Sequence, residues 1–217
     1  MFQQLLYKLY LLPIVLFSLS IHELCHGYAA YKLGDDTAKS MGRLTINPLA
    51  HLDILGTIAM LFFGFGWAKP VPVNFSKLKY RRLGPILVSI AGPLSNILLA
   101  FICYFVLVVL GINDISTEGF WGSYLLSALI MNVTLAAFNL IPIPPLDGSK
   151  VVISLLPYKW QYKVYSVEIY IQIALFALLY IGALDPVIAA VRNFVMKLLF
   201  AGILGVLWLF SRMKNLF

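Results

Sequence analysis

The chain has 217 residues, of which 61% are hydrophobic and only 12% are charged, and its mean hydropathy is +0.91. This composition excludes an ordinary soluble globular domain, in which about a quarter of the residues are charged, and it predicts an integral membrane protein. The formal net charge of +7 does not indicate a nucleic-acid binder, because the basic residues lie between the apolar segments and form no single patch.

Five apolar segments are long enough to cross a bilayer, whose hydrocarbon core requires about 20 helical residues. They are residues 4–31, 84–110, 121–141, 166–183 and 187–210. A shorter apolar piece at 54–66 is expected to be re-entrant or interfacial, because about 13 residues do not span a bilayer comfortably. The sequence therefore predicts an all-α polytopic membrane protein with about five to six transmembrane helices.

The charges of the connecting loops predict how these segments are oriented. Lysines and arginines gather in residues 32–83, in 149–165 and in the tail, whereas 111–120 contains acidic residues and neither Lys nor Arg. Cytoplasmic loops carry an excess of Lys and Arg, so we expect five crossings with the N-terminus outside. The last segment carries Arg192 and Lys197, and it could instead begin as an amphipathic helix on the outer surface before a short final span.

The connection between the first two long segments has a less regular pattern. Residues 37–47, TAKSMGRLTIN, are predicted to form a hairpin. Residues 67–76 are predicted to form an edge strand, because Pro70 and Pro72 favour extended backbone. An exposed extended edge can bind another chain as an added strand. We therefore expect a small β or re-entrant region here, within a single membrane domain that covers residues 1–217.

A polar cluster, HELCH, interrupts the first apolar segment at residues 22–26. His22 and His26 lie four residues apart, so both imidazoles can bind one metal ion from the same face of a helix. In H-E-x-x-H motifs the glutamate, here Glu23, acts as general base toward a metal-bound water. Two histidines and a carboxylate with one open position suit Zn²⁺, one per chain. Ionisable residues in a span cost about 2.5–3.5 kcal/mol apiece, which favours a functional site over a chance match.

A third protein ligand is required, and once Asp35 and Asp36 are set aside because they lie in a polar loop, two candidate carboxylates remain on the expected inner side of the membrane. Asp147 follows the inner end of the third long segment, and Asp53 lies in the connection between the first two. The spacing of these residues does not exclude either of them.

Three motifs, in this order along the chain, resemble those of the site-2 protease family of intramembrane zinc metalloproteases. They are HELCH, AGPLSN at 91–96 and NLIPIPPLDG at 139–148, the last of which matches N-x-x-P-x-P-x-L-D-G at every fixed position. The stretches NPLAHLDILGT and GWAKPVPVN are similar to those of the compact bacterial and archaeal branch that lacks a PDZ domain. The resemblance covers about residues 15–150.

The resemblance implies a hydrolase in which His22, His26 and Asp147 hold the zinc and Glu23 activates the water. It also implies that the substrates are single-span membrane proteins, which are unwound and cut within or near the bilayer in regulated intramembrane proteolysis. Further expected site residues are Asn96 and Asn139 as substrate or oxyanion contacts, Pro70, Val71, Pro72 and Val73 as the edge that pairs with substrate, and His51 and Asp53 behind the ligands. The alternative role for the two asparagines is a hydrogen bond between spans.

We expect a catalytic core at about residues 4–150, accessory spans at about 166–210, and an active site on the cytoplasmic side of a prokaryotic cell membrane. The expected partners are transmembrane substrates, the lipid bilayer and a regulatory membrane protein, with no nucleic acid. Two other classes of protein compete with this interpretation: a membrane metal transporter that uses the same three ligands, and a proteolytically inactive scaffold that binds membrane segments. Glu23 separates the first from a protease, because a transporter does not need a general base.

Overall fold

The computed structural model describes residues 2–63, 66–112 and 119–214, and the regular elements within these ranges are helices. In chain order they are α1 (Phe2–Lys32), α2 (Thr37–Ser40), α3 (Pro48–His51), α4 (Ile54–Phe63), the 3-10 helix η1 (Phe75–Lys77), α5 (Leu83–Ile112), α6 (Phe120–Asn139), α7 (Asp147–Leu155), α8 (Tyr158–Ser166), α9 (Glu168–Tyr180) and α10 (Asp185–Lys214).

Four of these helices, α1, α5, α6 and α10, are long and apolar enough to cross a membrane. The helices α8 and α9 meet at a bend of 59° and make a fifth span if the pair is counted as one. Helices suit this setting because every backbone polar group inside a bilayer must find its partner within the protein. The prediction of an all-helical polytopic membrane protein is confirmed with four to five spans, and the described residues contain no sixth.

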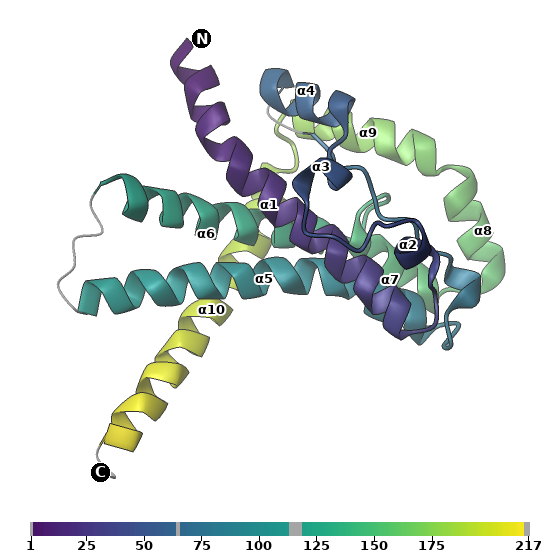
Figure 1. Cartoon of the computed structure of the whole chain (residues 1–217). Helices are drawn as coiled ribbons and strands as arrows, with labels where there is room; N and C mark the ends of the chain where they lie inside the picture. The colour runs from purple at the N-terminus through teal and green to yellow at the C-terminus, as the bar shows by residue number, and fades with distance from the viewer. Residues whose placement is uncertain (1, 64–65, 113–118, 215–217) are drawn as a thin grey trace.

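Helices α5 and α6 lie side by side, and α1 crosses both of them (Figure 1). Helix α7 packs against the N-terminal half of α5, and α10 packs against α5 and α6. An apolar cluster joins α5, α6 and α10. Its buried residues are Ala100 on α5, Leu129 and Val133 on α6, and Val195 and Leu199 on α10.

The predicted β region is wrong: the described residues of this connection contain no strand. Part of the predicted hairpin is helix α2, and the backbone N–H groups of Met41 and Arg43 donate to the carbonyls of Thr37 and Ala38. These local bonds satisfy groups that a hairpin would have paired across two strands. Residues 67–74 form neither helix nor strand, and Pro70 and Pro72 favour extended backbone there, so we call residues 67–74 the extended segment.

Helix α4 is too short to span a bilayer and lies near the N-terminal half of α1 (Figure 1). The Asp53 carboxylate caps its start by accepting a 2.8 Å hydrogen bond from the Gly56 N–H. A Cβ atom at Gly56 would collide with the backbone of Trp67, so only glycine permits this close approach. Near the other end, the Lys8 ammonium donates to the Leu61 carbonyl at 2.6 Å.

Candidate metal centre

The structure brings His22, His26 and Asp147 together from two helices. The two histidines project from the same face of α1, and Asp147 is the first residue of α7. Their atoms form a tight triangle: His22 Nε2 and His26 Nε2 are 3.0 Å apart, and Asp147 Oδ2 lies 3.1 and 2.9 Å from them. All three residues are buried, with exposed fractions of 4%, 8% and 5%.

The outer nitrogen of each imidazole faces a hydrogen-bond acceptor. His22 Nδ1 lies 2.7 Å from Asn96 Oδ1, and His26 Nδ1 lies 2.7 Å from the Val88 carbonyl oxygen. Because acceptors face both Nδ1 atoms, we assign the proton of each neutral ring to Nδ1. Each Nε2 atom therefore directs a lone pair into the triangle.

Two nitrogen lone pairs and a carboxylate oxygen converge in this triangle with no proton between them, so they need a cation. The edges of a zinc tetrahedron with bonds of 2.0–2.1 Å are about 3.3 Å long, close to the separations found here. A Cβ atom at Gly92 of α5 would collide with His26 Nε2, so glycine is required where α5 passes the triangle. The donor set and its spacing fit Zn²⁺.

A chain of side-chain amides supports His22 from behind. Asn132 on α6 donates through Nδ2 to the Ala128 carbonyl, which turns its Oδ1 toward Asn96. Asn96 donates to that oxygen at 2.9 Å and to the Ser18 carbonyl at 3.3 Å. The orientation of the Asn96 amide is therefore determined, and its own oxygen faces His22.

Asp147 and Glu23 are also held by specific partners. The second oxygen of Asp147, Oδ1, accepts a 2.9 Å hydrogen bond from the Lys150 ammonium, which leaves Oδ2 for the triangle. Glu23 follows His22 on α1, and its Oε2 accepts a 2.7 Å bond from the Val71 N–H of the extended segment. Among the described residues, none donates to Glu23 Oε1.

The other expected site residues have the following places. Asn96 is fully buried behind His22 and hydrogen-bonds across α1 and α6. Asn139 donates from its amide to the Leu135 carbonyl of its own helix at 3.0 Å. His51 lies 2.9 Å through Nε2 from the Thr45 carbonyl, and Asp53 caps α4, so neither joins the triangle. Of the extended segment, Val71 touches Glu23.

Sequence reasoning missed Val88, Asn132 and Lys150. A backbone carbonyl such as that of Val88 has no signature in the sequence. Asn132 did have a signature in the sequence, because an amide inside an apolar segment is costly unless it finds a hydrogen-bond partner. Lys150 follows Asp147 by three residues, a spacing that places the two side chains on the same side of a helix.

The chain is similar in sequence to known proteins. The profile of peptidase family M50 matches residues 10–116 and 111–181. YwhC of Bacillus subtilis is 43% identical over 198 residues, which are 87% of this chain and 90% of YwhC. MJ0611 of Methanocaldococcus jannaschii is 35% identical over 133 residues, which are 60% of this chain and 62% of that protein.

A third relative, Rip2 of Mycolicibacterium smegmatis, is 32% identical over 146 residues, which are 61% of this chain and 52% of Rip2. Each of the three relatives carries the words zinc metalloprotease in its name. No solved structure matches the chain. The family match and the coverage of YwhC show that the chain belongs to peptidase family M50, the site-2 protease family, and is a zinc metalloprotease.

Proposed function

We propose that His22, His26 and Asp147 bind the zinc ion, that Glu23 is the general base, and that the substrates are transmembrane proteins. One observation carries the assignment of the ligands. Three acceptor atoms of buried residues lie within about 3 Å of one another. The Nδ1 atoms of both imidazoles already face other hydrogen-bond partners. Such a set is costly without a cation at its centre.

The bound zinc would supply a water of lowered pKa and would polarise the carbonyl that is attacked. Glu23 would accept the proton of the attacking water through Oε1, and would then pass it to the departing nitrogen. The Val71 N–H holds the other carboxylate oxygen and so limits the rotation of the Glu23 side chain. Asn96 keeps the Nε2 lone pair of His22 directed at the metal by accepting the Nδ1 proton.

Pro70–Val73, within the extended segment, are the basis for proposing that the substrate binds in an unwound form. In a helix the peptide groups are bonded to one another, so a peptide bond must leave the helix before it can be hydrolysed. The Val71 bond fixes the segment beside Glu23, and the Arg43 guanidinium donates to the carbonyl of Lys69 at 2.9 Å. A substrate strand that lies along this edge would pass next to the general base.

The metal centre is proposed to face the cytoplasmic side of a prokaryotic cell membrane. The basic residues of 32–83 flank the end of α1 that carries the histidines, and the positive-inside rule assigns such loops to the cytoplasm. The relatives in Bacillus subtilis and Methanocaldococcus jannaschii are consistent with a prokaryotic membrane. A regulatory membrane partner that controls substrate access is part of the same proposal.

The proposal is tested by combining zinc analysis with cleavage of single-span peptides in detergent or in vesicles. The wild type is expected to hold about one zinc per chain and to cleave members of the panel. The variant Glu23→Gln is expected to keep the zinc and to lose activity by about 10²–10⁴-fold. Glu168→Gln, at the start of α9, is the matched control.

Two outcomes would contradict the proposal. Cleavage by Glu23→Gln at the wild-type rate would exclude Glu23 as the base. A wild type that holds zinc and cleaves no membrane peptide, while it moves zinc across vesicles, would favour the transporter.

A further inference from the structure

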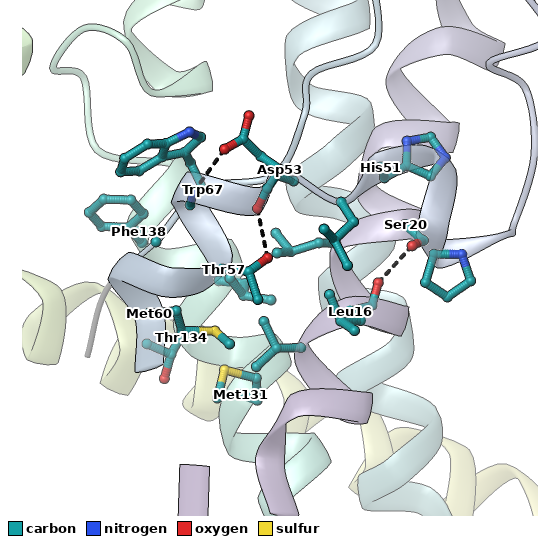
Figure 2. Close-up of a pocket in the computed structure, with 18 of the residues that line it drawn as sticks. Leu16, Ser20, His51, Asp53, Thr57, Met60, Trp67, Met131, Thr134 and Phe138 are labelled. Carbon is teal, nitrogen blue, oxygen red and sulfur yellow. Dashed lines mark hydrogen bonds between the residues drawn. The ribbon is translucent and has the colours of Figure 1, made fainter. Parts of the chain in front are cut away.

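A pocket with a volume of about 260 Å³ lies between α1, α6 and the α3–α4 region, and is mostly apolar (Figure 2). Met60, Met131 and Thr134 lie together in one part of it, and Trp67 and Phe138 lie near each other in another. The pocket does not include the three metal ligands, although Ser20 of its lining lies only two residues before His22.

Helix α1 connects the pocket directly to the general base. Leu16, Leu19 and Ser20 line the pocket. Glu23 follows Leu19 by four residues and Ser20 by three, so it lies one turn further along the same face of α1. At 1.5 Å per residue, the four residues from Leu19 to Glu23 correspond to about 6 Å along the helix axis.

Two other walls of the pocket also lead to the metal centre. Trp67 and Ala68 line the pocket, and the same extended segment donates the Val71 N–H to Glu23 three residues later. On α6, Phe138 lies in the lining immediately before the stretch 139–147 that ends at Asp147. A chain bound along these three walls would have one part in the pocket and a neighbouring part at Glu23.

We infer that this pocket binds an apolar side chain of the unwound substrate, within about two residues of the peptide bond that is cut. The inference rests on the proposed function. An extended chain advances about 3.3 Å per residue, so the rise of about 6 Å along α1 from Leu19 in the lining to Glu23 corresponds to about two residues of substrate. The pocket is smaller than the roughly 300–1,000 Å³ of sites for drug-sized ligands, as expected for a single large side chain.

The wall formed by α4 is anchored at both ends, which gives the pocket a defined size. Asp53 caps the N-terminus of α4, and Lys8 of α1 bonds to the Leu61 carbonyl at the opposite end. The close approach of Gly56 to Trp67 ties α4 to the extended segment. A pocket with fixed walls discriminates by side-chain size, and each methylene is worth about 10–200-fold in kcat/KM.

The experiment measures kcat/KM for one single-span peptide whose cut position has been mapped by mass spectrometry. The two residues on each side of the cut are replaced one at a time by Ala, Leu or Phe. For the wild type, one of these positions is expected to favour Leu or Phe over Ala by about 10-fold or more. In Thr134→Phe, which fills the pocket, this preference is expected to disappear while the Ala peptide is still cleaved.

Loss of bound zinc would reveal that Thr134→Phe fails to fold. In that case Met60→Trp, which fills the pocket from α4, replaces it in the experiment. Leu126→Phe, at an exposed position of α6 outside the lining, is the matched control and should keep the wild-type preference. Equal losses for all peptides in both filling variants, or an unchanged preference, would overturn the inference. A wild type that cleaves no peptide would instead contradict the proposed function.

Discussion

The paired helices α5 and α6 have two neighbouring regions with opposite chemistry. Asn96 and Asn132 bond to each other behind His22. One turn further along α5, Ala100 packs with Val133 of α6 in the apolar cluster that holds α10. Lipid is as apolar as these side chains, so the cluster stabilises the bundle through close packing, whereas the amides orient His22, a proposed metal ligand. Substitutions one turn apart should therefore affect different properties of the protein.

The largest effect in the polar region is expected from Asp147→Asn, which replaces the carboxylate of a proposed zinc ligand by a neutral amide. The zinc content measured by elemental analysis should fall from about one per chain to near zero, and cleavage should be lost with it. Asp53→Asn should retain the zinc, because Asp53 caps α4. The reverse result would show that the ligand has been assigned to the wrong carboxylate.

A smaller effect is expected when the support of His22 is removed. Asn96→Leu leaves the Nδ1 proton of His22 without an acceptor, and the zinc affinity in a competition titration should fall about 10–100-fold. Asn96→Asp should restore most of the affinity, because a carboxylate also accepts that proton. Asn132→Leu should weaken binding less than Asn96→Leu, since it acts through Asn96. Equal zinc affinities in the wild type and Asn96→Leu would remove Asn96 from the centre.

The apolar region is expected to respond in stability alone. Leu129→Ala opens a cavity between α6 and α10 and should cost about 2 kcal/mol, the low end of the range for buried leucines. The thermal midpoint in detergent should fall while the zinc affinity stays unchanged. Leu126→Ala, at an exposed position of the same helix, should change neither quantity. A large loss of zinc affinity in Leu129→Ala would mean that the two regions are not independent.

The smallest effect concerns Asp35, a buried carboxylate that ties the end of α1 to the extended segment. Burial raises its pKa, but hydrogen bonds from Thr37 and from the backbone N–H of Asn74 outweigh this and hold the pKa below the usual range. Because the folded pKa is lowered, the stabilisation is present above the unfolded pKa of about 3.9 and is lost as the pH falls through the folded value.

Replacing Asp35 by Asn should therefore lower stability by about 1 kcal/mol at neutral pH. The difference in thermal midpoint between wild type and variant should shrink as the pH falls below about 4. Zinc content at neutral pH should not change, because Asp35 lies outside the triangle. A difference that is constant from pH 7 to pH 3 would show that the charge of Asp35 has no role.

The spans could be predicted from the sequence because a bilayer imposes a minimum length of apolar helix. Helices α1, α5, α6 and α10 all lie where long apolar segments occur. The connection between α1 and α5 carries no comparable constraint. Its prolines favour extended backbone but do not determine whether that backbone pairs in a sheet, and the choice between a hairpin and the helix α2 depended on local hydrogen bonds around Thr37 that propensity does not determine.

The core of the metal centre was likewise accessible from the sequence, because His22 and His26 are four residues apart and their burial in a span is costly. The sequence left the third carboxylate open between Asp147 and Asp53. Only the tertiary structure shows that Asp147 on α7 meets the histidines of α1. The supports at Val88, Asn132 and Lys150 depend on how the helices cross. Such contacts between segments distant in sequence become visible only in the folded protein.

Gly92 implies that His22 and His26, two of the proposed metal ligands, are also part of the helix interface. Where α5 passes α1, the space that a side chain at position 92 would fill is occupied by the imidazoles of His22 and His26. The two rings act there as packing groups, and the ion between them would hold those groups at a fixed spacing. Removing the metal should therefore loosen the contact between α1 and α5 as well as stop hydrolysis. In this protease the catalytic ion would serve as a structural element of the bundle.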